Sequence, residues 1–301
     1  MSQTREGTKT LYLVDASPYI FRAYFSLPET IVSPLNRPMN AVYGYTHFLC
    51  DLVEKTQPQF MAIAFDESLG HCFRNDLYPP YKANRDLPPV DLAAQLKACQ
   101  TITHALGIKT YVSDHFEADD IIGTIGHRLR RRDFSMVYVS SDKDLAQLVC
   151  SGDVLWDYAR NRRFTPVTIR RHFGVTPEQF VDYLALMGDA VDNIPGVPKV
   201  GAKSAVQLLK RFKTLTSLYN RIDEVEKMML RGAGTIRRNL EAYRGQAFLS
   251  QQLARIHTRV PLRCSVEQLR RKRLRQRELG VLMEEFGFGD RLNKQIGRIF
   301  A

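Results

Sequence analysis

The stretch SMVYVSSDKD, residues 135–144, joins a short run of β-branched and aromatic residues directly to two aspartates. Similar apolar runs recur through the first half of the chain and alternate with longer amphipathic stretches. This alternation is typical of a mainly parallel β-sheet covered by helices. We expect strands at TLYLV (10–14), FMAIAF (60–65), IKTYV (108–112), SMVYVS (135–140) and, with a weaker pattern, DVLWD (153–157).

Acidic residues follow these runs at the points where the strands should end. Asp15, Asp66 and Asp142 lie at or next to the ends of three of them. In open α/β sheets the carboxyl ends of the strands border one crevice, so these side chains should converge. A further acidic group, EADD (117–120), runs into an apolar segment. Its position also suits the first turn of a helix, where the macrodipole favours acids, and both readings stay open for this segment alone.

The acids of these motifs form one large candidate group. Carboxylates brought together in such numbers repel one another unless cations neutralise them. All-oxygen ligands select hard ions such as Mg²⁺ or Mn²⁺. Two such ions about 4 Å apart can activate water and stabilise the leaving oxygen during phosphodiester cleavage. The candidate metal ligands are Asp15, Asp66, Glu117, Asp119, Asp120, Asp142, Asp144, Asp189 and Asp192.

The overall charge points to a polyanionic partner. The 301 residues include 43 Lys and Arg against 32 Asp and Glu, a formal net charge of +11. Nucleic acid is therefore the leading partner, ahead of an anionic membrane surface. The 5 cysteines form no C-x-x-C pair, and we expect reduced thiols in a cytoplasmic protein. No apolar stretch is long enough to span a bilayer, so no membrane association is expected.

A second motif is NIPGVPKVGAKSAVQLL, residues 193–209. Two glycines bracket a tight turn, and a helix should follow from about Ala202. Free N–H groups at a helix start bind phosphate without reading sequence. The motif therefore resembles a helix-hairpin-helix. A plain joint between helices is the alternative; a P-loop is not, because no strand precedes the turn. The candidate DNA-binding residues here are Gly196, Lys199, Val200, Gly201, Lys203 and Ser204.

Two basic segments have no clear assignment. RLRRRD (128–133) should end the helix that begins at EADD, and cations are favourable at a helix C-terminus, so we interpret it as structural. LRRKRLRQRE (269–278) either follows a phosphate backbone or forms a solvated helix face, and the sequence does not decide between them.

In combination these motifs closely resemble the 5′ nuclease family, which includes the 5′→3′ exonuclease domain of bacterial DNA polymerase I, phage 5′ exonucleases and flap endonucleases. The matching pieces occur in family order from Leu11 to Leu292. They are LVDAS, AFDES followed by FR at Arg74, YPPYKANR (78–85), EADD, SSDKDLAQL, GDAVDNIPGVPKVGAKSA and FGFGDRL.

The resemblance implies an α/β fold with a PIN-like nuclease core and a mainly parallel central sheet. It further implies a helical arch over the active site and a C-terminal helical region that contains the helix-hairpin-helix. From about Thr165 onward the apolar spacing becomes helical. We therefore divide the chain into a core at 1–164, with the arch at about 68–97, and a helical region at 165–301, with the hairpin at about 185–210.

The resemblance also assigns roles. Asp15, Asp66, Glu117, Asp119 and Asp142 would surround one metal, whereas Asp142, Asp144, Asp189 and Asp192 would serve a second; Asp120 is less certain as a direct ligand. In the arch, Lys82 and Arg85 would act on the scissile phosphate, with Arg74 nearby and Tyr81 a candidate for stacking on a base. The alternative is a solvated loop with a buried tyrosine. The hairpin carbonyls could hold a K⁺ ion.

The expected function is a structure-specific, divalent-metal-dependent 5′ nuclease with 5′→3′ exonuclease and 5′-flap endonuclease activity in DNA replication and repair. Its substrates would be DNA with a 5′ end or flap, including RNA–DNA primer junctions. No polymerase or proofreading region follows, so we expect a stand-alone monomer. The alternatives are a non-catalytic DNA-junction binder of the same fold and a PIN-type ribonuclease.

Overall fold

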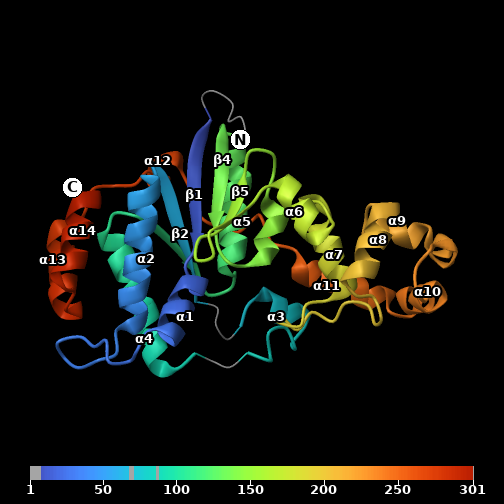
Figure 1. The fold of residues 1–301 in the computed structure, drawn as a ribbon, viewed down its shortest axis with the longest axis horizontal. Coiled ribbons are helices and arrows are strands. Elements are labelled where there is room, and N and C mark those ends of the chain that lie inside the picture. Colours follow the sequence, from blue (N-terminus) through green and yellow to red (C-terminus); the bar gives the residue numbers. More distant parts are fainter. Residues whose placement is uncertain (1–7, 68–70, 86–87, 301) are drawn as a thin grey trace.

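The computed structural model describes residues 8–67, 71–85 and 88–300. Its centre is one sheet with the strand order β3-β2-β1-β4-β5-β6, in which β1 to β5 are parallel and β6 is antiparallel (Figure 1). The mainly parallel sheet predicted from the sequence is thus confirmed. The strands are β1 Lys9–Asp15, β2 Phe60–Asp66, β3 Lys109–Ser113, β4 Phe134–Val139, β5 Val154–Asp157 and β6 Arg162–Phe164.

All five predicted runs form strands, whereas β6 was not predicted. It has 3 residues, two of them arginines, and lies at the edge of the sheet. An edge strand needs no apolar face of its own, so its sequence carries no alternating pattern.

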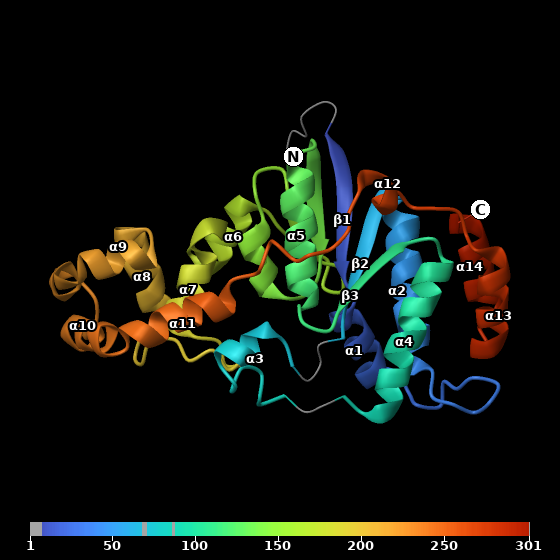
Figure 2. The ribbon, with the colours of Figure 1, turned by 180° about the vertical axis from the view of Figure 1, so that it is seen from behind.

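Helices cover both faces of the sheet. On one face α1 (Ser17–Ser26), α2 (Asn40–Thr56) and α4 (Val90–Ala105) share a hydrophobic core with residues of the C-terminal helices α13 (Gln276–Phe286) and α14 (Asp290–Phe300). On the other face lies α5 (Ala118–Arg130), seen in front of the sheet in Figure 2. The C-terminal pair therefore packs on the core side of the molecule, although the division proposed above groups it with the helical region.

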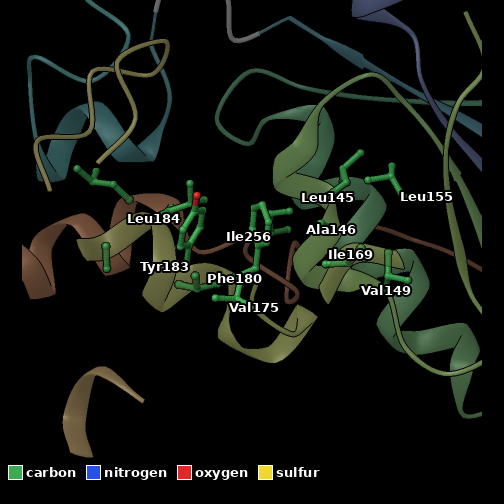
Figure 3. Packing of buried hydrophobic residues seen from close by; sticks show 14 of the residues in the cluster. Leu145, Ala146, Val149, Leu155, Ile169, Val175, Phe180, Tyr183, Leu184 and Ile256 are labelled. Carbon is green, nitrogen blue, oxygen red and sulfur yellow. The ribbon is translucent and has the colours of Figure 1, made fainter. Parts of the chain in front are cut away.

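Most of the remaining helices extend from the β6 side of the sheet, whereas the short helix Val266–Leu269 lies beside the start of β2 (Figure 1). One hydrophobic core continues across residue 164, from Leu145 and Leu155 to Ile169 and Phe180 (Figure 3). Since protein cores are close-packed, the two parts are held in one arrangement. The helices are α6 Pro166–Phe173, α7 Phe180–Met187, α8 Ala202–Phe212, α9 Leu215–Asn220, α10 Ala233–Ala242, α11 Arg244–Ala254 and α12 Val266–Leu269, with 3₁₀ helices η1 Lys143–Leu148, η2 Pro177–Gln179 and η3 Ile222–Lys227.

The segment predicted as an arch connects β2 to α4. It contains the short helix α3 (Phe73–Leu77), turns through residues 78–85 and the first turns of α4. Residues 68–70 and 86–87 of the predicted arch lie outside the described residues. Among the residues that are described, no helix is long and apolar enough to cross a membrane.

Candidate active site

Two aspartates meet at the carboxyl ends of neighbouring strands. Asp15 closes β1 and Asp66 closes β2. Ser17 joins them, because its backbone N–H donates to Asp15 (3.2 Å) and its hydroxyl donates to Asp66 (3.1 Å). The Ser140 hydroxyl, beyond β4, donates to the other oxygen of Asp15 (2.8 Å). The strand ends therefore converge as the sequence predicted, and two serines fix the carboxylates.

The helix α5 brings a second pair of acids to the same place. Its N-terminal residue Ala118 donates its N–H to Asp66 (2.7 Å), which ties the helix start to the end of β2. Glu117 is the N-cap residue, and Asp119 lies in the first turn. The positive end of the helix dipole thus points toward the acids and favours their ionised forms.

A cavity of about 440 Å³ lies at this junction. Basic and aromatic residues of the segment 71–85, including Tyr81, Lys82 and Arg85, form part of its wall. Carboxylates from the ends of β1 and β2, the start of α5 and the segment after β4 form another part. The acids that line it are Asp15, Asp66, Glu117, Asp119 and Asp142, the same five assigned to one metal by the family resemblance.

Three of the clustered acids have pKa values raised well above the ordinary value, first by burial and then by neighbouring carboxylates. Burial, together with Asp66 and Asp142, raises the pKa of Asp15 well above its ordinary value. Burial and the neighbouring Asp142 and Asp15 do the same to the pKa of Asp119. Burial and Asp142 likewise raise the pKa of Asp144. These groups are costly to ionise in the absence of a cation.

A second group of acids lies beside this cavity. Asp142 accepts the backbone N–H of Asp144 (2.8 Å), so the two share one turn at the start of η1. One carboxylate oxygen of Asp144 is buried without a hydrogen-bond partner among the described residues. Asp189 pairs with Lys143. Asp192 pairs with Arg85, and the Lys82 ammonium lies 3.7 Å from it.

Lys82 connects the two groups. Its ammonium pairs with Glu117, and its backbone N–H donates to the Asp192 carbonyl (3.0 Å). The backbone of Lys82 itself is left-handed, with φ of 55°. Although burial alone would raise the pKa of Glu117, Lys82 and Arg74 lower it overall. Glu117 is therefore ionised and already neutralised by side chains, unlike Asp15 and Asp119.

Among the described residues, no group of three or more His, Cys, Asp or Glu side chains has an arrangement that could hold a metal ion. Lys82, Arg85 and Lys143 engage three of the acids. The donor set nevertheless fits hard divalent cations. It is all oxygen, several members have pKa values raised by burial and by neighbouring carboxylates, and the buried oxygen of Asp144 has no hydrogen-bond partner among the described residues.

Two predicted site residues, Asp120 and Arg74, lie outside the cavity lining, and a third, Tyr81, lines the cavity but is buried. Asp120 is fully buried and binds Arg74 through both oxygens (2.8 Å each), and it also accepts the His257 N–H (2.7 Å). Neither Asp120 nor Arg74 lines the cavity. Tyr81 is 3% exposed and its hydroxyl donates to Glu117 (3.1 Å) and Asp192 (3.2 Å). The Tyr81 ring is therefore packed against its neighbours in this structure, and its stacking on a base stays a prediction.

The predicted helix-hairpin-helix is formed by α7 and α8. Gly196 has φ of 62°, and a Cβ there would lie 2.3 Å from the Gly188 nitrogen, so only glycine fits. Gly201 is the N-cap of α8 and has open space around it. Lys203 is exposed in the first turn of α8, and Lys199 is in the turn. Val200, by contrast, is 3% exposed and packs inward. Ser204, in the same first turn of α8 as Lys203, is half-buried.

Sequence reasoning missed the residues that organise the acids. Ser17 and Ser140 are ordinary residues after two strands, and only their positions, two residues beyond the end of β1 and one beyond the end of β4, signal their role. Lys143 stands between Asp142 and Asp144 in SSDKD and pairs with Asp189 instead. Its partner is 46 residues away, so local spacing could not reveal the pair.

Comparison with known proteins agrees with this geometry. Residues 10–174 match the family described as 5′-3′ exonuclease, N-terminal resolvase-like domain, and residues 175–277 match 5′-3′ exonuclease, C-terminal SAM fold. The chain belongs to the 5′-3′ exonuclease family. It is 34% identical to a 5′-3′ exonuclease of Buchnera aphidicola subsp. Schizaphis graminum over 94% of this chain and 98% of that protein. It is also 40% identical to DNA polymerase I of Pseudomonas aeruginosa, over 86% of this chain but only 28% of the polymerase.

Solved structures confirm the fold of this exonuclease. The T5 5′-exonuclease, with divalent metal ions bound, superposes with a TM-score of 0.67 at 20% identity, covering 97% of this chain and 98% of that one. The catalytic core of Rad2 in complex with DNA substrate gives 0.62 at 15% identity, covering 98% and 93%. The family resemblance and the α/β fold with a C-terminal helical region are thereby confirmed, and the chain is a nuclease by family.

Proposed function

We propose that this exonuclease hydrolyses phosphodiester bonds at 5′ ends and at 5′ flaps of DNA during replication and repair, with Mg²⁺ or Mn²⁺ as its cofactor. The observation that carries this proposal is the cavity at the carboxyl ends of the strands. Carboxylates line one part of it, and Lys82 and Arg85 line another. A phosphodiester needs both: cations to neutralise its developing charge and donors to orient it.

The acids divide into two groups that would hold two ions. When bound, such ions supply a water of lowered pKa and neutralise charge on the phosphate and the leaving oxygen. Ser17 and Ser140 hold Asp15 and Asp66 in fixed rotamers, which orients the ligands before a cation arrives. The first group is Asp15, Asp66, Glu117, Asp119 and Asp142; the second is Asp142, Asp144, Asp189 and Asp192.

Lys82 and Arg85 would orient the scissile phosphate. In the structure both cations are paired with carboxylates, Glu117 and Asp192. A phosphate oxygen presents the same charge and hydrogen-bond acceptors as a carboxylate, so each cation can exchange its partner for the substrate. The exchange frees the two carboxylates for cations as the substrate enters.

Arg74, Asp120 and Tyr81 are positioning residues in this proposal. Arg74 bridges Asp120 and Glu117, and Tyr81 hydrogen-bonds to Glu117. The pair Arg74–Asp120 fixes the start of α5 and thereby the rotamer of Glu117. Asp120 is therefore not proposed as a metal ligand, since its oxygens are already occupied.

The hairpin would hold the duplex beside the cut. Exposed Lys203 and the free N–H groups at the start of α8 suit a phosphate contact that reads no sequence. A K⁺ ion in the hairpin is also part of the proposal. The carbonyls of Gly196 and Pro198 already accept from Gln246 and Asn239, so such an ion would use other oxygens of the turn or displace these amides. We further propose that the protein acts as a cytoplasmic monomer and accepts RNA–DNA primer junctions.

Cleavage of a 5′-flap DNA with Mg²⁺ tests the proposal. The expected result is release of the flap near the junction, and loss of cutting but not of binding in the variant Asp142→Asn/Asp144→Asn. An intact flap under conditions where the protein binds it would leave only a junction binder. Faster cutting of a matched RNA flap would instead indicate a ribonuclease.

A further inference from the structure

The opposite edge of the sheet, where the strands begin, carries cations that the cleavage site does not use. In Figure 2 this edge is at the top, next to the start of β1 and the helix α12. Its cations come from three separate segments: the start of β1, the turn after α5 and the segment after α12. We name it the basic edge, and its residues are Lys9, Arg131, Arg132, Arg270, Lys272 and Arg273.

The segment after α12 is fixed along the starts of two strands. Arg270 forms an isolated bridge with Phe60 at the start of β2. Lys272 donates its N–H to the Gly107 carbonyl (3.0 Å), just before β3. Gly107 has φ of 75°, and a Cβ there would lie 2.5 Å from the Lys272 oxygen, so the two backbones are in close contact. These backbone contacts fix the position of the segment against the sheet.

Two of the cations rest on one pair of aromatic rings. Phe60 and Phe134, on β2 and β4, pack edge to face with centroids 5.0 Å apart. The Arg270 guanidinium lies 5.1 Å from the Phe60 centroid, and the Lys9 ammonium lies 5.8 Å from the Phe134 centroid. Charges from distant parts of the sequence are thus brought side by side and held by cation–π contacts.

The charge of the basic edge is largely uncompensated. All six side chains belong to exposed residues. Arg270 pairs with Glu267 at 3.8 Å, whereas Arg131, Arg132, Lys272 and Arg273 form no ion pair with any residue of the described part of the chain. Arg131 and Arg132 also border a hollow of about 350 Å³ that is lined in part by Cys264 and Val266. An exposed cluster with such an excess of positive charge suits a polyanion.

A helix C-terminus explains only part of this cluster. Cations there are favourable in themselves, and the neighbours Arg128 and Arg130 fit that account, because they bind backbone carbonyls and Asp153. It does not explain Lys272 and Arg273, which belong to another segment and have no ion-pair partner within the described ranges.

The basic edge is too far from the cavity to share the same phosphates. β1 has 7 residues between Lys9 and Asp15, and at roughly 3.3 Å per residue its ends are about 20 Å apart. Along the edge, the four strands from β3 to β4 span about 14 Å at about 4.8 Å per strand spacing. Measured along the axis of a duplex, that length corresponds to about four nucleotides of one strand, at a rise of about 3.4 Å each.

We propose that the basic edge binds the phosphate backbone of a second nucleic-acid segment, without sequence preference, while another segment occupies the cleavage cavity. Arginine predominates in it, as expected for phosphate recognition through paired N–H donors. The contact would keep the enzyme on a long polyanion between cuts.

Two-segment binding provides the test. The cleavage-inactive variant Asp142→Asn/Asp144→Asn is saturated with unlabelled 5′-flap DNA, and a fluorescent duplex without a flap is then titrated and followed by anisotropy. The test variant adds Arg132→Gln/Lys272→Gln/Arg273→Gln. The control adds Lys97→Gln/Arg291→Gln/Lys294→Gln, which removes the same charge from exposed positions on α4 and α14.

We expect the control to bind the second duplex and the test variant to bind it about tenfold or more weakly. The magnitude of the slope of log K against log salt should fall by about 2–3, because each lost phosphate contact accounts for about 0.9 of it. The charge-retaining variant Arg132→Lys/Arg273→Lys should keep the binding, and all variants should cut a short flap normally in the active background. Complete displacement of the duplex by the flap, equal losses in test and control, or equally tight binding of polyglutamate would overturn the proposal.

Discussion

Asp119 and Asp120 are consecutive residues at the start of α5, yet their surroundings are opposite. Asp119 lines the cavity, where burial and neighbouring carboxylates raise its pKa. Asp120 is fully buried on the other side of the helix, and Arg74 neutralises it through two hydrogen bonds of 2.8 Å. The difference shows that neighbouring acids of one motif can have different surroundings: Asp119 meets other carboxylates in the cavity, whereas Arg74 neutralises Asp120.

The largest expected effect separates the two residues by activity. Asp119→Asn should lower the single-turnover rate of flap cleavage by about 10²–10³-fold, because it removes a charge that would hold a cation at the phosphate. Its stability in EDTA should be equal to or above that of the wild type. Retained cleavage would show that Asp119 is not part of the metal site.

A loss of folding stability is the next largest effect. Asp120→Asn or Arg74→Met leaves a buried charge without its partner, and breaking such a pair costs about 3–5 kcal/mol. Urea unfolding measures this. The double variant Arg74→Met/Asp120→Leu should recover much of the loss, since it leaves neither charge buried. If the single variants unfold like the wild type, the pair does not hold the start of α5.

The pH dependence of stability sharpens the contrast further. The pKa of Asp119 is raised in the folded state, so its protonated form stabilises the fold, and this contribution is lost as pH rises from about 3.8 through the folded pKa. The stability advantage of Asp119→Asn over the wild type in EDTA should therefore grow with pH across that window. Excess Mg²⁺ should remove this stability advantage. A difference in stability between the variant and the wild type that is constant with pH would contradict the raised pKa of Asp119.

The smallest effect concerns Lys143. Although burial alone would raise the pKa of Asp189, the Lys143 ammonium lowers it. Lys143→Gln should move Asp189 toward the situation of Asp119 and raise its pKa. We expect a several-fold change in the Mg²⁺ concentration that gives half-maximal cleavage, with kcat at saturating Mg²⁺ little affected. The matched Lys210→Gln, at an exposed position late in α8, should leave the Mg²⁺ dependence unchanged.

Much of the fold could be predicted from the sequence, because strand runs and acids at their ends are local signals. The hairpin was also predictable, since Gly196 and Gly201 mark its turn. The distinction between Asp119 and Asp120 was not, because it depends on Arg74, which lies 46 residues before Asp120. The burial of Tyr81 was not predictable for the same reason, because its partners Glu117 and Asp192 come from other elements of the fold.

The hydrophobic core continues from η1 and β5 into α6 and α7, and this continuity bears on where the DNA would be cut (Figure 3). The hairpin and the acids cannot shift relative to each other without opening close-packed side chains. In the proposed mode of binding, a duplex on the hairpin would therefore reach the cavity after a fixed length of strand. The buried residues Leu145, Ile169 and Phe180 would then help to set the length of the released product without contacting DNA.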